Sequence, residues 1–320
     1  MEQHTSRRVL CVGLCCADII NVCDHYPKED TDQRSADYYW QRGGNASNSS
    51  SALALLGANV EFLGTLVRGR EYKFLTDDFA AYGIHADQCP VSEESPDVKG
   101  AVAVIVINRQ NGSRTIMAAI NHVPELKMEH FQNIQLHNYK WIHFEGRQNI
   151  DEIEKMIQRV QEYNTSCNTD QRISTSLEFE KPRLPGLGRL LDQVDYVFVS
   201  KDLAVSRGYQ NKEEAARGFM HSCRPGGTVI CAWGDDGAAA KTGSDDVITS
   251  LVYSPKTVVD TLAAGDTFNG ATIFALSSGL DVGGAIRFGC MVAGTKCGMV
   301  GNKGIKGLQN QLDSFRTHQK

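Results

Sequence analysis

Residues 260–271 read DTLAAGDTFNGA, and this stretch decides how the chain is interpreted. A strand-like run at 256–259 (KTVV) leads into a turn of small residues at 263–265, and Asp266 then opens a predicted long helix. The first backbone N–H groups of a helix have no partner within it, and together with the helix dipole they form an anion site. Small side chains would let a phosphate approach those N–H groups. A carboxylate at this place can accept the proton of an incoming hydroxyl, so the stretch has both features that phosphoryl transfer needs.

Asp266 also has a simpler explanation, because Asp is a common N-cap residue of ordinary helices. On this stretch alone the two explanations stay open. Two other phosphate-binding motifs are missing from the sequence. It contains no GxxxxGK[ST], which disfavours a P-loop NTPase, and no GxGxxG follows the first predicted strand.

Outward from this stretch, short apolar runs alternate with longer periodic or Ala-rich segments. Strands are predicted at 9–14, 59–65, 141–145, 173–180, 196–200 and 228–233. Helices are predicted at 46–56, 72–82, 151–163, 212–221, 266–277 and 282–296. Buried strands separated by helices predict an α/β fold in three layers, with a mostly parallel sheet covered by helices on both faces. A chain of 320 residues then fits a single domain, 1–320.

Two segments depart from this alternation. Residues 18–42 and 97–121 look like pairs of strands joined by turns, and NRQNGSR at 108–114 is a hairpin signal. They predict a small accessory β-sheet that could act as a lid over a cleft. The polar tail at 307–320 is predicted to be loose or a short surface helix.

A second motif lies near the start of the chain, where residues 42–57 read RGGNASNSSSALALLG. The glycine pair at 43–44 allows a close-approach turn. Asn45 and Asn48 then lie on one face of a starting helix, and their amides offer the donors and acceptors that suit sugar hydroxyls. A glycine turn followed by an Asn-capped helix is the alternative.

Two aspartates are further candidates. Asp18 follows the first predicted strand, at the end of the sheet where open α/β folds bind ligands, although it could equally cap a turn. Asp30, within YPKED, falls in the first predicted β excursion, and composition alone favours a solvated turn there.

The bulk composition narrows the class of partner. Net charge is −5, from 33 basic and 38 acidic residues, and the basic residues are scattered. This disfavours nucleic acid or an anionic membrane as the main partner. The 10 cysteines form no CxxC pair and several fall in apolar runs, so a reducing, cytoplasmic location is expected. The run VLCVGLCCA after Arg7-Arg8 is interpreted as a buried strand rather than a targeting signal, and no apolar stretch approaches a membrane span.

The two motifs, in this order and at this separation, resemble the two signature regions of the ribokinase-like (PfkB) carbohydrate kinases. Further similar strings are VLCVGL, YPKED, WIHFEGR, VFVSKD, CAWGDDGA and RFGCMVAGTKCG, so the resemblance covers residues 9–298. It is strongest toward the branch of the family that phosphorylates fructose. The activity implied is transfer of the γ-phosphate of ATP to the 1-hydroxyl of D-fructose.

The resemblance implies a role for each candidate residue. Asp266 would be the catalytic base, and the transferring phosphate would be held by the backbone N–H groups of Ala263, Ala264, Gly265 and Asp266. The sugar would be bound by Asp18, Gly44, Asn45 and Asn48, with Arg147 lining the site. The nucleotide would be bound by Arg114, Gly234, Asp235, Asp236, Gly237 and Cys297. Without the family, Arg114 and Arg147 would pass as ordinary surface charges and Cys297 as packing.

The family also implies partners and cofactors. A homodimer with interlocked β lids would bring Asp30 to the sugar site of the second subunit. ATP is expected with Mg²⁺ held mainly by the nucleotide phosphates and water, because the stretch that corresponds to the Asn-x-x-Glu element of many ribokinases reads SKDL at 200–203 and lacks that pair. A requirement for K⁺ is compatible with the family.

One departure from the family pattern keeps other functions open. Ala263 stands where many relatives have Gly, and its methyl group could narrow the phosphate site. Another sugar or nucleoside kinase of the same family is one alternative. A catalytically weakened sugar-binding regulator is a second alternative, against which the intact Asp266 and Gly265 argue.

Overall fold

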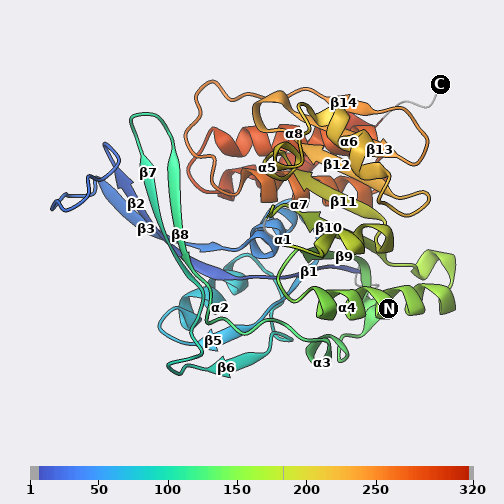
Figure 1. Ribbon diagram of the computed structural model, residues 1–320, viewed down its shortest axis with the longest axis horizontal. Coiled ribbons are helices and arrows are strands. Elements are labelled where there is room, and N and C mark those ends of the chain that lie inside the picture. Colours follow the sequence, from blue (N-terminus) through green and yellow to red (C-terminus); the bar gives the residue numbers. More distant parts are fainter. Residues whose placement is uncertain (1–6, 183, 317–320) are drawn as a thin grey trace.

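The computed structural model describes residues 7–182 and 184–316, and it is built around an eight-stranded sheet (Figure 1). From one edge to the other the strands are β14 (Ile248–Ser250), β13 (Ala238–Thr242), β12 (Thr228–Ala232), β11 (Tyr196–Ser200), β10 (Ser174–Phe179), β9 (Tyr139–Glu145), β1 (Arg8–Val12) and β4 (Val60–Leu63). The six strands from β12 to β4 are parallel, whereas β13 and β14 are antiparallel. The prediction of a mostly parallel α/β sheet is confirmed.

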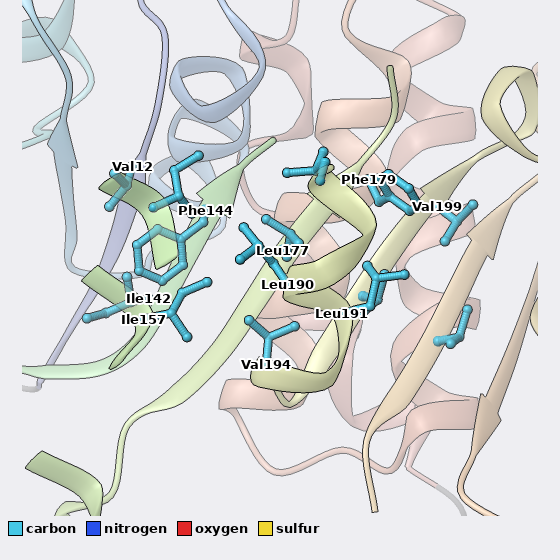
Figure 2. Close-up of a cluster of buried hydrophobic side chains, with 14 of the residues drawn as sticks. Val12, Ile142, Phe144, Ile157, Leu177, Phe179, Leu190, Leu191, Val194 and Val199 are labelled. Carbon is cyan, nitrogen blue, oxygen red and sulfur yellow. The ribbon is translucent and has the colours of Figure 1, made fainter. Parts of the chain in front are cut away.

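Helices cover both faces of this sheet. One face carries α1 (Asn45–Leu55), α2 (Tyr72–Ala81), α7 (Ala264–Ser277) and α8 (Val282–Cys297). The other carries α3 (Met128–Phe131), α4 (Ile150–Ser166), the 3-10 helix η3 (Leu187–Gln193), α5 (Lys201–Ser206) and α6 (Lys212–Met220). Figure 2 shows the core on this second face, where Ile142, Phe144 and Leu177 of the strands meet Ile157 and Leu190 of the helices. The three layers match the pattern of buried strands and amphipathic helices in the sequence.

A second, four-stranded sheet projects from this body (Figure 1) and is called the lid sheet here. Its order is β3 (Asp37–Gly43), β2 (Cys16–Cys23), β7 (Val102–Asn108) and β8 (Arg114–Ala119). The two segments that depart from the helix–strand alternation, 18–42 and 97–121, supply these strands. A separate parallel pair, β5 (Leu66–Arg68) and β6 (Val91–Glu93), lies beside α2.

The lid sheet has two unlike faces because neighbouring side chains on a strand alternate. On the inner face Ile20, Ala103 and Ile105 pack against Leu262, which belongs to the turn before α7. The lid sheet therefore contacts the segment that is predicted from the sequence to form an anion site.

The structure differs from the sequence predictions in the region before α7. Residues 256–259 are not a strand, and the whole stretch 251–260 is an irregular loop. At the C-terminal end the structure has a 3-10 helix, Leu308–Phe315, in agreement with the second of the two alternatives for the tail, a short surface helix, and residues 317–320 lie outside the described part. Within 7–182 and 184–316, no helix is long and apolar enough to cross a membrane.

Candidate active site

The candidate residues gather at the carboxyl ends of the parallel strands, where α1 and α7 both begin. Helix α7 begins at Ala264 with Ala263 as its N-cap, so Asp266 lies in the first turn rather than at the cap. Helix α1 begins at Asn45 after Gly44, and neither helix has a side-chain cap. The explanation of Asp266, Asn45 and Asn48 as simple N-caps is therefore wrong.

Asp266 is buried and is held by helix α1. Asn48 Nδ2 donates to Asp266 Oδ2 at 2.9 Å, and the Ser49 hydroxyl donates to the Asp266 carbonyl at 3.2 Å. Burial, and then the negative charge of Glu180, raise the pKa of Asp266 well above its ordinary value, although the Asn48 hydrogen bond opposes the shift. A carboxylate with a raised pKa is a stronger base than an ordinary Asp, which suits it to take a proton from a hydroxyl.

The turn that leads into α7 determines which N–H groups can face an anion. Ala264 N–H already donates to the Thr261 carbonyl at 3.3 Å, and Thr267 N–H donates to Ala263 O at 2.9 Å. A Cβ atom added at Gly265 would meet nothing within 4 Å, so the space beside this residue is open. The N–H groups of Gly265 and Asp266, at the first turn of the helix, are the best placed to receive a phosphate.

Ala263 has a left-handed backbone, with φ 58° and ψ 20°. Among the described residues, only Asp30 is a second non-glycine residue with positive φ. The left-handed conformation costs an L-residue about 1–2 kcal/mol. Ala263, which stands where many relatives have Gly, therefore strains the backbone in addition to placing a methyl group near the phosphate site.

An Ala263→Gly variant is expected to unfold at a higher temperature, because glycine adopts this φ without strain and relieves up to about 1–2 kcal/mol. The same change should raise kcat/KM for ATP by less than about tenfold, since the strain is limited to one residue. Thermal melts and steady-state kinetics at saturating sugar test both effects. A Gly variant that is equal or worse in both assays would show that Ala263 already fits its site.

The glycine pair before α1 is required by close packing. A Cβ atom on Gly44, where φ is 95°, would lie 2.3 Å from the Leu14 carbonyl oxygen. A Cβ atom on Gly43 would lie 2.2 Å from Asp18 Oδ2. The turn therefore brings the start of α1 against Asp18, which joins two of the predicted sugar-binding elements.

Asp18 lies in lid strand β2, six residues beyond the end of β1, and is buried. Burial raises the pKa of Asp18 from 3.8 to about 6, and a hydrogen bond from the Cys16 thiol at 3.0 Å opposes this shift. Its carboxylate lies on the inner face of the lid sheet, next to Gly43, two residues before the start of α1.

A cluster of buried carboxylates completes the site, and sequence reasoning missed it. Glu145 ends β9, Glu178 lies near the end of β10, and Glu180 follows β10. Asn45 Nδ2 donates to Glu178 Oε1 at 3.1 Å and to Glu180 Oε2, and Asn269 Nδ2 donates to Glu178 Oε1 at 3.3 Å. Because the Asn45 amide nitrogen is used in this way, its carbonyl oxygen is left to accept from a ligand.

The carboxylates of this cluster have opposite pKa shifts. Burial, and then the charges of Glu180 and Asp266, raise the pKa of Glu178 well above its ordinary value. Burial acts in the same direction on Glu145, but Lys181 and Arg147 outweigh it and bring its pKa below the ordinary value. Two carboxyl groups whose pKa values are shifted in opposite directions therefore lie close to Asp266.

Arg147 is buried beside this cluster and lines a small cavity together with Glu125 and Glu145. Its guanidinium forms a bidentate pair with Glu125, at 2.7 and 2.8 Å, and donates to Glu145 Oε1 at 3.2 Å. Glu145 in turn accepts from the N–H groups of Leu14 and Ala46 at 2.9 and 3.2 Å. The structure thus connects Arg147 to the start of α1 through Glu145.

A cavity of about 450 Å³ lies on the other side of α7. Five of the predicted nucleotide residues line it, namely Arg114, Gly234, Asp235, Gly237 and Cys297, together with Ala264 and Gly265 of the turn. Asp236 is the exception, because its carboxylate and carbonyl face Lys212 on α6. Arg114 reaches from lid strand β8 and donates to the Thr261 hydroxyl at 2.7 Å.

The cavity has an apolar wall that was not predicted. It is formed by Val252, Tyr253, Pro255, Val258, Phe268, Cys290 and Ala293. The first four belong to the irregular loop 251–260, whose mixed composition carries no motif, whereas the last three belong to α7 and α8 and look like ordinary core positions. An apolar wall with a few polar groups suits a flat heterocyclic base with phosphates attached.

Asp30 is exposed and lies in the connection between β2 and β3 rather than in a strand. It has φ 57° and lies outside the cluster around Asp266. The single chain therefore does not bring Asp30 to its own candidate active site.

The described residues hold no group of three or more His, Cys, Asp or Glu side chains that could bind a metal ion.

Comparisons with known proteins agree with this arrangement. Mouse ketohexokinase is 44% identical over 299 residues, which are 93% of this chain and 99% of the mouse protein. The Giardia lamblia ribokinase structure has a TM-score of 0.80 at 16% identity and covers 97% of this chain and 99% of its own. The Arabidopsis thaliana ribokinase, solved with ribose and ATP, has a TM-score of 0.75 at 18% identity with the same coverage, and these two likenesses show the fold.

The family assignment rests on the sequence as a whole. A model of the pfkB family of carbohydrate kinases matches residues 6–304, nearly the full length of the chain. With that match and the relative at 44% identity, this chain belongs to the pfkB family of carbohydrate kinases, and it is an enzyme of the sugar kinase class.

Proposed function

We propose that this enzyme transfers the γ-phosphate of ATP to the 1-hydroxyl of D-fructose, giving fructose 1-phosphate and ADP. The observation that carries the proposal is the position of Asp266. It lies in the first turn of α7, between Asn48 of α1 and the cavity that Gly265 lines. The choice of fructose is supported by the 44% identity to a protein named ketohexokinase.

In the proposed reaction Asp266 accepts the proton of the sugar hydroxyl. The hydroxyl oxygen attacks the γ-phosphorus, and the bond from that phosphorus to the β-phosphate oxygen breaks, so that ADP leaves. The N–H groups of Gly265 and Asp266 stabilise the charge of the moving phosphoryl group, assisted by the dipole of α7. Ala263 and Ala264 shape this anion site through the turn they form.

The sugar is proposed to lie between the lid sheet and α1. Asp18 and the carbonyl oxygens of Asn45 and Asn48 would accept from its hydroxyl groups, and Asn48 Oδ1 is buried without a hydrogen-bond partner among the described residues. Gly44 allows the tight turn that places the start of α1 beside the proposed sugar site, and Arg147 acts through Glu145. Three hydrogen-bond acceptors directed at one ligand site suit a ligand with several hydroxyl groups.

The nucleotide is proposed to occupy the cavity of about 450 Å³, with its phosphates toward Gly265. Arg114 would reach the phosphates, whereas Gly234, Asp235, Gly237 and Cys297 would border the base and ribose. Mg²⁺ bound to the nucleotide phosphates would neutralise part of their charge. Stimulation by K⁺ remains a prediction, tested by replacing KCl with a tetramethylammonium salt in the activity assay.

A coupled ADP-release assay tests the function, with fructose, ribose, adenosine and an aldohexose offered side by side. The proposal predicts the highest kcat/KM for fructose. A clear preference for ribose or adenosine would instead assign another activity within the family. Binding of fructose without turnover of any sugar would favour a weakened regulator.

The reduced, cytoplasmic location is proposed on the same grounds as before, namely cysteines that are free throughout the described chain.

We propose in addition that two copies associate through the outer face of the lid sheet. Trp40, Ile19, Val104 and Met117 form one row across its four strands, as their pairing shows. Trp40 is 41% exposed and Met117 is 53% exposed, and Tyr38 beside them is 69% exposed. A contiguous apolar row of this kind marks an interaction surface, and lids that pack against each other would cover it.

An Asp30→Ala variant tests whether the second subunit reaches the sugar site. In an interlocked dimer the exposed loop of one lid would approach the cleft of the other. Loss of a charged hydrogen bond there costs about 1.5–3 kcal/mol, so KM for fructose should rise about tenfold or more while KM for ATP stays unchanged. Asp32→Ala, an exposed residue of the same loop, is the control. An unchanged KM for fructose in the Asp30 variant would reject the cross-subunit role.

A further inference from the structure

Lys296 is a fully buried lysine near the end of α8. Its ammonium lies 2.9 Å from Asp260 Oδ2 and donates to the carbonyl oxygen of the same residue, also at 2.9 Å. The Asp260 side chain is only 4% exposed. This ion pair is almost completely removed from water, and neither of its residues is a candidate sugar-binding or nucleotide-binding residue.

Asp260 connects the end of α8 to the turn before α7. Its Oδ1 accepts from the Leu262 N–H at 2.8 Å, and its Oδ2 accepts from the Gly301 N–H at 3.0 Å. Its own N–H and that of Val259 both donate to the Cys297 carbonyl, at 3.2 and 2.8 Å. One carboxylate therefore fixes three segments, of which one continues directly into the phosphate-binding turn.

The turn held in this way is strained. Ala263, next to Leu262, has φ 58°, and its carbonyl is fixed on the other side by Thr267 N–H. Such a conformation persists only where the surrounding structure over-determines it. The Asp260 bond to Leu262 N–H fixes the backbone one residue before the strained alanine, so the turn is held at both ends.

Stability alone is a poor explanation for this pair. A buried ion pair is often no more stabilising than apolar side chains of the same volume, because both charges lose their hydration. The ion pair is therefore expected to affect the position of the N–H groups of Gly265 and Asp266 more than the stability of the fold.

We propose that Lys296 is a positioning residue for phosphoryl transfer, whose ammonium fixes Asp260 and through it the turn that presents the phosphate-binding N–H groups. The inference rests on the proposed function, since it assigns the phosphate site to this turn. It predicts unequal effects on the two substrates, because Lys296 contacts Asp260, on the nucleotide side. Asp18 lies on β2, and Asn45 lies on α1 with its amide held by Glu178 of β10.

The test compares Lys296→Met with the double variant Lys296→Met/Asp260→Asn in the full chain. The single change leaves a buried carboxylate unpaired, which can prevent the protein from folding, so the double variant is the deciding one. It removes both charges, and the Asn oxygen can still accept from Leu262 N–H. Lys306→Met, an exposed lysine after α8, is the matched control. Calorimetry measures affinity for ADP and for fructose separately, and steady-state kinetics give kcat/KM for ATP.

The proposal predicts that the folded double variant keeps fructose affinity within about twofold, whereas kcat/KM for ATP falls by about 10²-fold, the effect of a misplacement near 1 Å. ADP should bind more weakly as well. Wild-type kinetics and ADP affinity in the double variant would overturn the proposal, and so would an equal loss of fructose and ADP affinity. If the unmodified enzyme phosphorylated no sugar, the proposed function would fail, but the ADP affinities would still decide the role of Lys296.

Discussion

An Asp266→Asn variant is expected to turn over fructose about 10²–10⁴-fold more slowly, the range that a general base contributes. The amide has the shape of the carboxylate but cannot accept the proton. Its oxygen can keep the hydrogen bond from Asn48, which is 2.9 Å in the native site, so the start of α7 should stay in place. The loss should therefore appear in kcat, while the affinities for both substrates remain close to those of the unmodified enzyme.

The measurement combines steady-state kinetics with calorimetric binding of fructose. Asp313→Asn, an exposed residue of the C-terminal 3-10 helix, controls for the loss of one negative charge. Turnover within a few-fold of the unmodified enzyme would show that another group takes the proton. Glu178 and Glu180 would then be the next candidates, because they couple electrostatically to Asp266.

A Gly265→Val variant is expected to fold normally and to lose about 10²-fold in kcat/KM for ATP, because displacing the phosphate by about 1 Å has an effect of that size. A Cβ atom at this position meets no atom within 4 Å, so the protein itself accommodates the side chain. Valine is also no worse than glycine in a helix. The branched side chain would instead occupy the open space beside the anion site, where the phosphate is proposed to lie.

Gly265→Ala gives a graded comparison, since its single methyl group fills less of the same space. Thermal melts should show both variants at least as stable as the unmodified enzyme, with fructose affinity unchanged. A valine variant with native kcat/KM for ATP would mean that the phosphate does not pass beside Gly265, and the anion site would have to be sought elsewhere.

Much of the fold could be predicted because local patterns and tertiary structure agree. The run at 196–200 and the helix from Lys212 are strongly apolar or strongly periodic, and the structure has them within a residue or two. β13 and β14 were missed because short Ala-rich or mixed strands such as AAAKT carry little β propensity. The run 256–259 has high β propensity, yet it lies as a loop at the cavity edge, where tertiary contacts outweigh propensity.

The site was predictable only where its residues lie in a motif. Asn45 and Asp266 stand beside glycines at helix starts, and the structure brings their elements together. Glu145 and Glu178 end apolar strands far apart in the sequence, so only the parallel order of β9 and β10 places them side by side. Lys296 lies near the end of a helix, where a lysine is usually exposed, and its burial follows from packing against Asp260, which no local pattern contains.

The most direct test of the central claim is the position of the phosphate on the product. The enzyme would be incubated with ATP and uniformly ¹³C-labelled fructose, and the product examined by ¹³C and ³¹P NMR. The account predicts coupling of phosphorus to C1, in a product that is nearly absent when the Asp266→Asn variant replaces the enzyme. Coupling to C6, or equal product from the variant, would contradict it.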